Sequence, residues 1–103
     1  MTPSPGSAVF FVAASLRVPG LGLLVLPVAP APAWLAAHPL HTALRLRLHR
    51  PGQPPLPLPA TIEELARDTQ PPARALLLDA DPGGPLPAGA WLELLRLAPA
   101  DLF

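Results

Sequence analysis

The segment His41-Thr42-Ala43-Leu44-Arg45-Leu46-Arg47-Leu48-His49-Arg50 carries the clearest pattern in the chain. Leucine recurs at every second position from 44 to 48, and polar side chains stand between and after the leucines. Because successive side chains of a β-strand point to opposite faces, a period of two predicts a strand with one buried and one solvated face. Pro51-Gly52 follows directly and predicts the turn that ends this strand.

Proline limits how long the other elements can be. The 103 residues include 18 prolines. Because proline lacks a main-chain N–H and clashes with the preceding turn, it breaks the interior of an α-helix. Few windows between the prolines could hold three turns of helix, so we expect no all-helical bundle. The segments that remain are about six to ten residues long, which is the usual length of a strand.

Six of these segments have strand character. The first two, 8–17 and 21–26, flank Val18-Pro19-Gly20. Proline fixes a negative φ at the second position of a type II turn and glycine supplies the positive φ at the third, so we expect a hairpin here. The remaining strands are expected at 41–50, 58–65, 73–79 and 90–97.

The sequence also predicts the character of the long connections between strands. Residues 27–39 are rich in Pro and Ala, and their largest side chain is Trp34. We expect a loop that this indole pins down, with one turn of helix at 34–37. Residues 81–85 form a Pro- and Gly-rich turn cluster, and Ala88-Gly89 leads into the last strand.

Two segments fit a helix as well as a strand. Residues 61–68 begin with Thr followed three places later by Glu, which is a capping box, and residues 91–97 are good helix formers. Propensity alone leaves both open. Six short strands otherwise predict an all-β fold, a small antiparallel barrel or sandwich, over residues 8–98. Flexible tails are expected at 1–7 and 99–103.

Composition excludes several classes of function. Without cysteine there is no disulfide framework, thiolate nucleophile or Cys-based metal centre. Seven arginines balance seven acidic residues, so the chain lacks the overall positive field that attracts nucleic acid or anionic lipid. No positive charge precedes the apolar run 8–16, unlike a signal peptide, and Arg17, Pro19 and Gly20 interrupt the longest apolar stretch. We expect a cytoplasmic protein with no membrane partner.

Several short motifs follow one another in a characteristic order. Over residues 11–25, a hydrophobic strand runs into Pro19-Gly20-Leu21-Gly22 and then into a second hydrophobic strand. The later segments are Leu44-Arg45-Leu46-Arg47-Leu48 before Arg50-Pro51-Gly52, then Ala60 to Leu65, Ala75 to Leu78, and Pro87 to Leu92. This series resembles the second, β-barrel domain of elongation factor Tu and related translational GTPases. The resemblance spans about residues 10–97 and is closest to small stand-alone bacterial proteins that carry this barrel alone.

The resemblance implies a six-stranded antiparallel barrel in which residues 60–65 are a strand and Pro19, Gly20, Gly22 and Gly89 form structural turns. In translation factors this barrel contacts RNA and the ribosome, so the resemblance also implies RNA as a partner. One departure is His38-Pro39-Leu40-His41, where the family usually has a Gly-Asp pair. GTP binding is not implied, because the chain has no lysine and therefore no Gly-x-x-x-x-Gly-Lys-Ser/Thr loop.

The residues do not predict a catalytic site. Of Ser4, Ser7 and Ser15, two fall in the expected tail and none sits in a nucleophile elbow. Glu63 and Glu64 are adjacent, so on a strand they point to opposite faces and cannot act as a carboxylate pair. We expect a protein that is not an enzyme and uses no cofactor.

A metal site is not predicted either. His41 and His49 share a strand parity, but eight residues at about 3.3 Å each place them roughly 26 Å apart, too far to share an ion. His38 adds no further partner to either. Asp79 and Asp81 lack the remaining oxygen ligands of a calcium loop, so they favour a turn cap.

The most suggestive polar feature is the row Arg45, Arg47 and His49, with Arg50 at the turn. Such a row could contact phosphates or an acidic partner. The alternative is a solvated face paired to Glu63 or Glu93 across the sheet. Trp34 and Trp91 lack the aromatic interleaving of base-stacking platforms and favour core or loop anchors.

These observations predict a binding module rather than an enzyme. A barrel of this size with a Pro-rich apolar loop exposes surface that a partner protein or a second copy can cover. The leading hypothesis is therefore protein–protein contact or self-association, through a candidate surface formed by Arg45, Arg47, His49, Arg50 and Trp34. The alternative hypothesis is RNA or ribosome binding through the arginine face.

Overall fold

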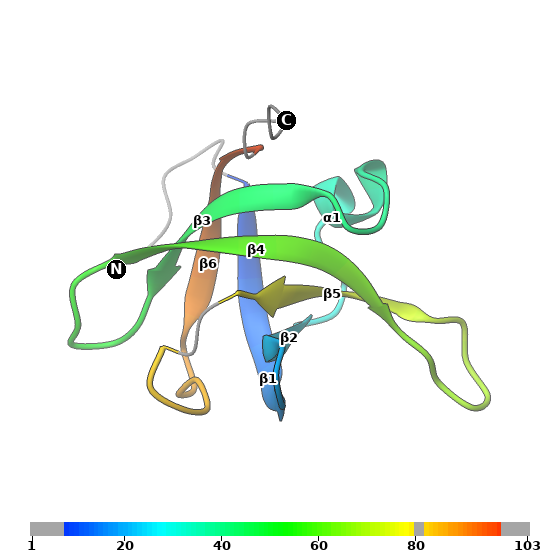
Figure 1. Ribbon diagram of the computed structural model, residues 1–103, viewed down its shortest axis with the longest axis horizontal. Coiled ribbons are helices and arrows are strands. Elements are labelled where there is room, and N and C mark those ends of the chain that lie inside the picture. The colour runs from blue at the N-terminus through cyan, green and yellow to red at the C-terminus, as the bar shows by residue number, and fades with distance from the viewer. Residues whose placement is uncertain (1–7, 80–81, 98–103) are drawn as a thin grey trace.

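The computed structural model describes residues 8–79 and 82–97. Its elements are β1 (Val9–Val18), β2 (Gly22–Pro27), α1 (Ala33–Ala37), β3 (Ala43–His49), β4 (Leu56–Leu65), β5 (Ala73–Leu78) and β6 (Trp91–Leu97). The strands pair antiparallel into a closed barrel in the order β1-β2-β5-β4-β3-β6 (Figure 1). The predicted all-β fold, a six-stranded antiparallel barrel, is confirmed. The tails predicted at 1–7 and 99–103, and residue 81 of the predicted turn cluster, lie outside the described residues.

Each predicted strand is present, with its ends displaced by no more than two residues. The two segments that propensity left open are strands, because each has partners on both sides: β4 lies between β3 and β5, and β6 lies between β1 and β3. A helix at either place would leave the neighbouring strands without main-chain partners. The predicted turn of helix in the long loop is α1.

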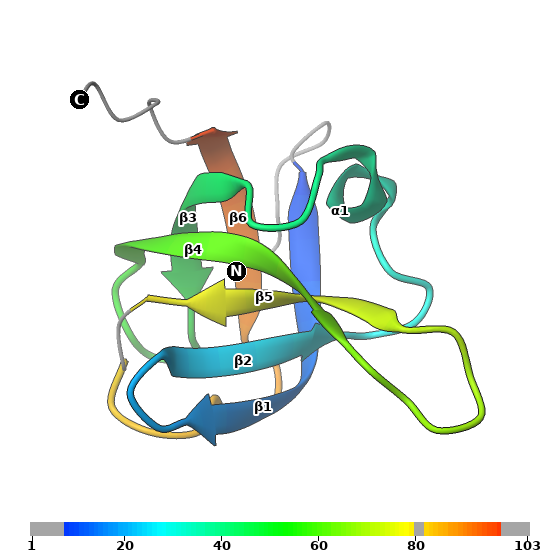
Figure 2. The same cartoon turned by 45° about the vertical axis from the view of Figure 1, so that its right-hand side comes forward.

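Closure of the barrel depends on β1, which changes partner along its length. Val9 to Phe11 pair with β6, whereas Ala14 to Val18 pair with β2. The register shifts between Val12 and Ala14, which marks a β-bulge. A bulge bends the strand and increases its local twist, so β1 can turn from one neighbour to the other (Figure 2).

The interior is filled mainly by leucine. Leu44, Leu46 and Leu48 of β3 are completely buried, whereas Arg45 and Arg47 between them are exposed, as the period of two predicts. The other strands contribute buried apolar side chains to the same core, and α1 adds the fully buried Leu35. Burial of one such side chain stabilises the fold by about 1.5–3 kcal/mol, so the leucines are the main source of stability.

Prolines lie in the half of β4 that precedes its ladder with β5. Arg47 pairs with Pro57 and Arg45 with Pro59, whereas pairing with β5 begins at Ala60. Pro59 O accepts a hydrogen bond from Asp79 N–H, on the β5 side, and Ile62 N–H donates to Thr42 O, on the β3 side. The odd-numbered residues of β4 therefore direct their main-chain groups away from β3. The missing N–H groups of both prolines fall on that side, so the β3–β4 ladder loses nothing.

The β1–β2 turn has the predicted geometry. Leu21 N–H donates to Val18 O at 3.0 Å, and Gly20 has a φ of +80°, as the third residue of a type II turn requires. Gly22 also has a positive φ, of +140°, and a Cβ placed there would lie 2.0 Å from the main-chain oxygen of Leu78. Gly89 stands in the turn before β6, where Ala90 N–H donates to Pro87 O.

We predict that Gly22→Ala lowers the free energy of unfolding much more than Gly20→Ala. The first change combines an unfavourable φ with a collision against the β5 main chain, and we expect a loss above about 2 kcal/mol. A Cβ at Gly20 meets nothing within 4 Å, so only the strain of a positive φ remains, about 1 kcal/mol. Urea unfolding of both variants measures the difference, and equal losses would contradict the close approach of β2 to β5.

Candidate interaction site

The predicted cationic row on β3 is only partly exposed. Arg45 and Arg47 are exposed, but His49 is buried, with 7% of its surface accessible. Its ring stacks on Trp91 of β6, with ring centroids 3.8 Å apart and an interplanar angle of 8°. The two residues stand directly opposite each other in the β3–β6 register, which brings the flat rings together. The prediction that His49 belongs to an exposed row is therefore wrong.

Glu93 neutralises part of this face. His49 Nε2 lies 3.1 Å from Glu93 Oε1, and Arg47 Nη1 lies 3.5 Å from the same oxygen. Of the two carboxylates predicted as cross-sheet partners, Glu93 takes that role and Glu63 instead contacts His41. Arg47 thus has a partner across the sheet, while 44% of its side chain stays accessible.

Arg45 is in a different position, because its cross-strand neighbour is another arginine. Arg45 stands opposite Arg96 in the β3–β6 register and opposite Pro59 in the β3–β4 register. Both arginines are exposed, and no carboxylate of the described residues pairs with either of them. Like charges directly opposite on neighbouring strands are destabilising. This pair therefore places two positive charges side by side on the barrel wall.

Arg50 and Trp34, the other predicted contact residues, are engaged in intramolecular bonds. Arg50 Nη1 donates to Pro82 O at 3.0 Å, and its Nε is buried without a hydrogen-bond partner among the described residues. Trp34 packs against the core, and its Nε1–H donates to Val9 O at 3.1 Å. The indole therefore ties α1 to β1, as predicted for a loop anchor, and is half-buried.

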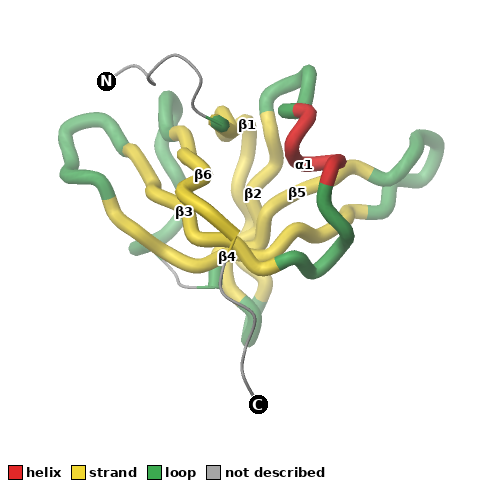
Figure 3. The backbone as a smooth tube through the Cα atoms, turned by 90° about the horizontal axis from the view of Figure 1, so that it is seen from above, coloured by secondary structure: helices red, strands yellow, loops and turns green. Residues whose placement is uncertain are grey.

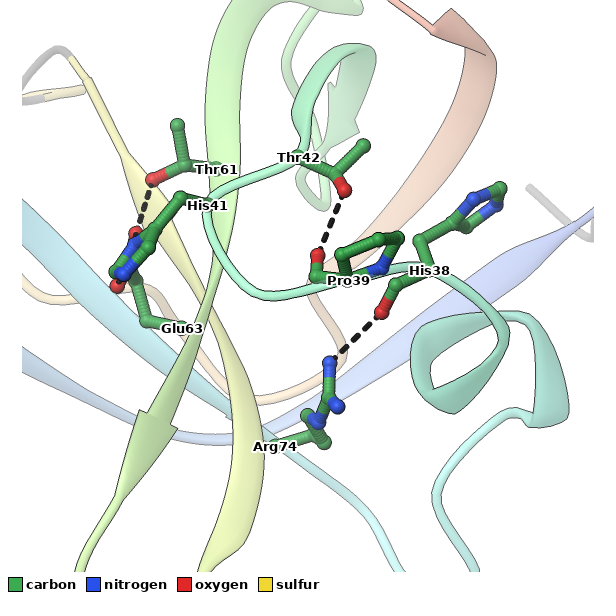
Figure 4. Close-up of polar contacts among 7 residues, drawn as sticks. All are labelled: His38, Pro39, His41, Thr42, Thr61, Glu63 and Arg74. Carbon is green, nitrogen blue, oxygen red and sulfur yellow. Dashed lines mark hydrogen bonds and ion pairs between the residues drawn. The ribbon is translucent and has the colours of Figure 1, made fainter.

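A second polar cluster holds the connection between α1 and β3 against β4 (Figure 4). His41 has a φ of +69°, and its Nδ1 lies 2.9 Å from Glu63 Oε1. Thr61 Oγ1–H donates to Glu63 Oε2 at 2.7 Å, and His41 N–H donates to Ile62 O. These contacts keep residue 41 in a conformation that is uncommon outside glycine.

The same connection is tied to β5 by Arg74, which donates from Nη1 to His38 O at 2.9 Å (Figure 4). Thr42 Oγ1–H closes the turn internally by donating to Pro39 O at 2.6 Å. Arg74 Nε lies 3.9 Å from Glu64 Oε2, its directly opposite neighbour on β4. Arg74 thereby joins the β4–β5 hairpin to the segment that follows α1.

An apolar groove of about 590 Å³ lies on the described surface. Its walls are α1 with the loop before it, the bulged part of β1, the end of β2, and the β4–β5 hairpin. Figures 2 and 3 show that this hairpin projects past the end of β2 on the side where α1 lies. The lining consists of alanine, proline and leucine with two charged residues, Arg67 and Arg74.

Small side chains leave this space open. Seven of the fifteen lining residues are alanine, namely Ala13, Ala14, Ala29, Ala31, Ala33, Ala36 and Ala73. Leu35 is completely buried where α1 meets the core. The groove is therefore a surface hollow that ends at the hydrophobic core. A volume of several hundred Å³ with mostly apolar walls is typical of ligand and peptide sites.

Part of this groove belongs to the Pro- and Ala-rich loop that the sequence predicts as a surface for a partner, which contributes Pro27, Ala29, Ala31, Pro32, Ala33, Leu35 and Ala36. The other lining residues, on β1, β2 and the β4–β5 hairpin, were not predicted. Nothing local predicts that residues 65–74 lie against that loop, because their contact depends on the order of the strands in the barrel.

Comparison with protein-family models, with curated proteins and with solved structures finds no match for the chain. The residues that the structure describes contain no group of three or more His, Asp or Glu side chains placed to hold a metal ion. In the same residues, no helix has the length and apolar character needed to cross a membrane.

Proposed function

We propose that the chain is a cytoplasmic, non-catalytic β-barrel module that binds another protein, or a second copy of itself, through the apolar groove. The observation that supports this proposal most strongly is the concave apolar surface between α1 and the β4–β5 hairpin. Removing such a surface from water contributes about 25 cal/mol per Å² of apolar area, which favours a partner with apolar side chains. Val28, which stands between the lining residues Pro27 and Ala29 in the chain, is a 48% exposed apolar side chain.

The described polar side chains also support a binding role over a catalytic one. Ser15 Oγ accepts a hydrogen bond from Leu86 N–H at 3.0 Å and so anchors the loop before β6. His49 is stacked and bonded to Glu93, and His41 is bonded to Glu63. Each of these groups holds a connection or a strand pair in place, which is a structural task.

Site-specific photo-crosslinking in cells tests the groove. Ala36 and Ala37 are both exposed residues of α1, but only Ala36 lines the groove. We expect a photoreactive phenylalanine analogue at position 36 to form a protein adduct and the same analogue at position 37 to form none. Mass spectrometry of the adduct separates a partner protein from a second copy. An absence of adducts at position 36, or the same adduct from both positions, would contradict the proposal.

RNA binding is the second candidate function, and one observation favours it: the exposed arginines Arg45 and Arg96 stand side by side, and within residues 8–79 and 82–97 no carboxylate pairs with them. An RNA phosphate between them would relieve their repulsion and form charge-assisted hydrogen bonds. The proposed resemblance to the second domain of elongation factor Tu points the same way. Two or three arginines give only modest attraction at physiological salt, so we rank this function below protein binding.

For this second function we predict opposite effects of Arg96→Glu on stability and on binding. The change replaces a like-charge pair by an ion pair, so the free energy of unfolding should rise by about 0.2–1 kcal/mol. Fluorescence anisotropy with a labelled single-stranded RNA at low salt should show weaker binding. Arg67→Glu, with the same charge change at a distant exposed site, is the control. No RNA binding by the wild type, or equal loss in the control, would exclude the arginine face.

A further inference from the structure

One edge of β5 is open where it borders the groove. Pairing of β5 with β4 continues to Ala73, but pairing with β2 stops at Leu76, opposite Val25. None of the described strands pairs with β5 on that side from residue 73 to residue 75. Ala73 and Arg74, at this edge, are among the residues that line the groove.

The cause of the open edge is Pro27. Asp79 N–H donates to Pro59 O. The main-chain N–H and C=O groups of the odd-numbered residues of β5 therefore point to β4, and those of the even-numbered residues point to β2. Continuing the register from Val25 and Leu76 would place Pro27 opposite Arg74. Proline has no N–H to donate to the Arg74 carbonyl, and Pro27 pairs instead with Val12 of β1. An incoming extended chain could supply the donor that Pro27 lacks.

The charges of the groove specify what else that chain should carry. Arg67 and Arg74 are the only charged residues of the lining. Arg67 uses Nε and Nη2 to bond Pro71 O, and Arg74 uses Nη1 to bond His38 O. Both keep further N–H donors in addition to these bonds. The acidic residues nearest in the hairpin, Glu64 and Asp68, do not line the groove, and Glu64 reaches Arg74 only at 3.9 Å.

We propose that the groove holds an extended segment of a partner protein that is apolar along its length and carries one Asp or Glu. The apolar side chains lie on the alanine- and proline-rich walls, the carboxylate lies against Arg67 and Arg74, and the main chain pairs with Arg74 at the open edge of β5. Strand addition and recognition of acidic motifs by arginine are both established modes of peptide binding. This inference rests on the proposed function and names the chemistry of the partner.

Selection of short random peptides on phage against the full chain provides the probe, and a selected peptide is then synthesised for calorimetry. We expect extended, apolar sequences that retain one acidic position. Ala36→Trp should fill the groove and weaken binding about tenfold or more, whereas Ala37→Trp should bind like the wild type. Arg67→Glu should weaken binding about fivefold, and the control Arg45→Glu should not. NMR should show contacts between the peptide and the main chain of Arg74.

Charge reversal makes the test specific. A peptide with lysine at its acidic position should bind the wild type weakly and recover affinity for Arg67→Glu. Binding that Ala36→Trp abolishes but Arg67→Glu leaves unchanged would overturn the acidic-partner inference. The proposal that the apolar groove binds a protein would then remain. Selected peptides with a helical spacing of apolar residues would overturn the extended pose. If no peptide is selected, or if Ala36→Trp does not affect binding, the proposal that the apolar groove binds a protein is itself overturned.

Discussion

The pairing of β1 with two different neighbours is the constraint on which the rest of the molecule depends. Its first half pairs with β6 and its second half with β2, so the sheet has no free first or last strand. Closure encloses the leucine side chains of β3 together with those of the other strands. It also sets the positions of the α1 loop and the β4–β5 hairpin, and therefore the groove between them.

Proline has two separate effects in this barrel. In β4, Pro57 and Pro59 occupy positions whose missing N–H groups point away from β3. The β3–β4 ladder therefore keeps all its hydrogen bonds. At the end of β2, Pro27 stops pairing with β5 and directs the chain to β1 and then to α1. Proline thus limits the length of the strands and also leaves the edge of β5 open beside the apolar groove.

Most strands were predictable because their signals are local: alternation at residues 44–48, and Pro or Gly at the turns. Propensity left residues 61–68 and 91–97 open between helix and strand, because their strand partners lie elsewhere in the chain. Only the Pro-rich loop of the candidate site was predictable, because the rest depends on contacts between residues far apart in the chain. His49 and Glu93 are 44 positions apart, and alternation alone placed His49 on the solvated face, where the Trp91 ring in fact covers it. Arg45 likewise has an arginine as its neighbour only through the β3–β6 register. Local patterns carry no information on such registers, nor on the hollow that small side chains leave between distant segments.

Nuclear Overhauser contacts across both sides of β1 test the closure most directly. A closed barrel predicts contacts between Phe10 and Leu92, on the β6 side, together with contacts between Leu16 and Leu24, on the β2 side. Both sets should appear in the same monomeric sample and disappear together on unfolding. Contacts on the β2 side without those on the β6 side would show that the sheet is open and would contradict closure of the barrel.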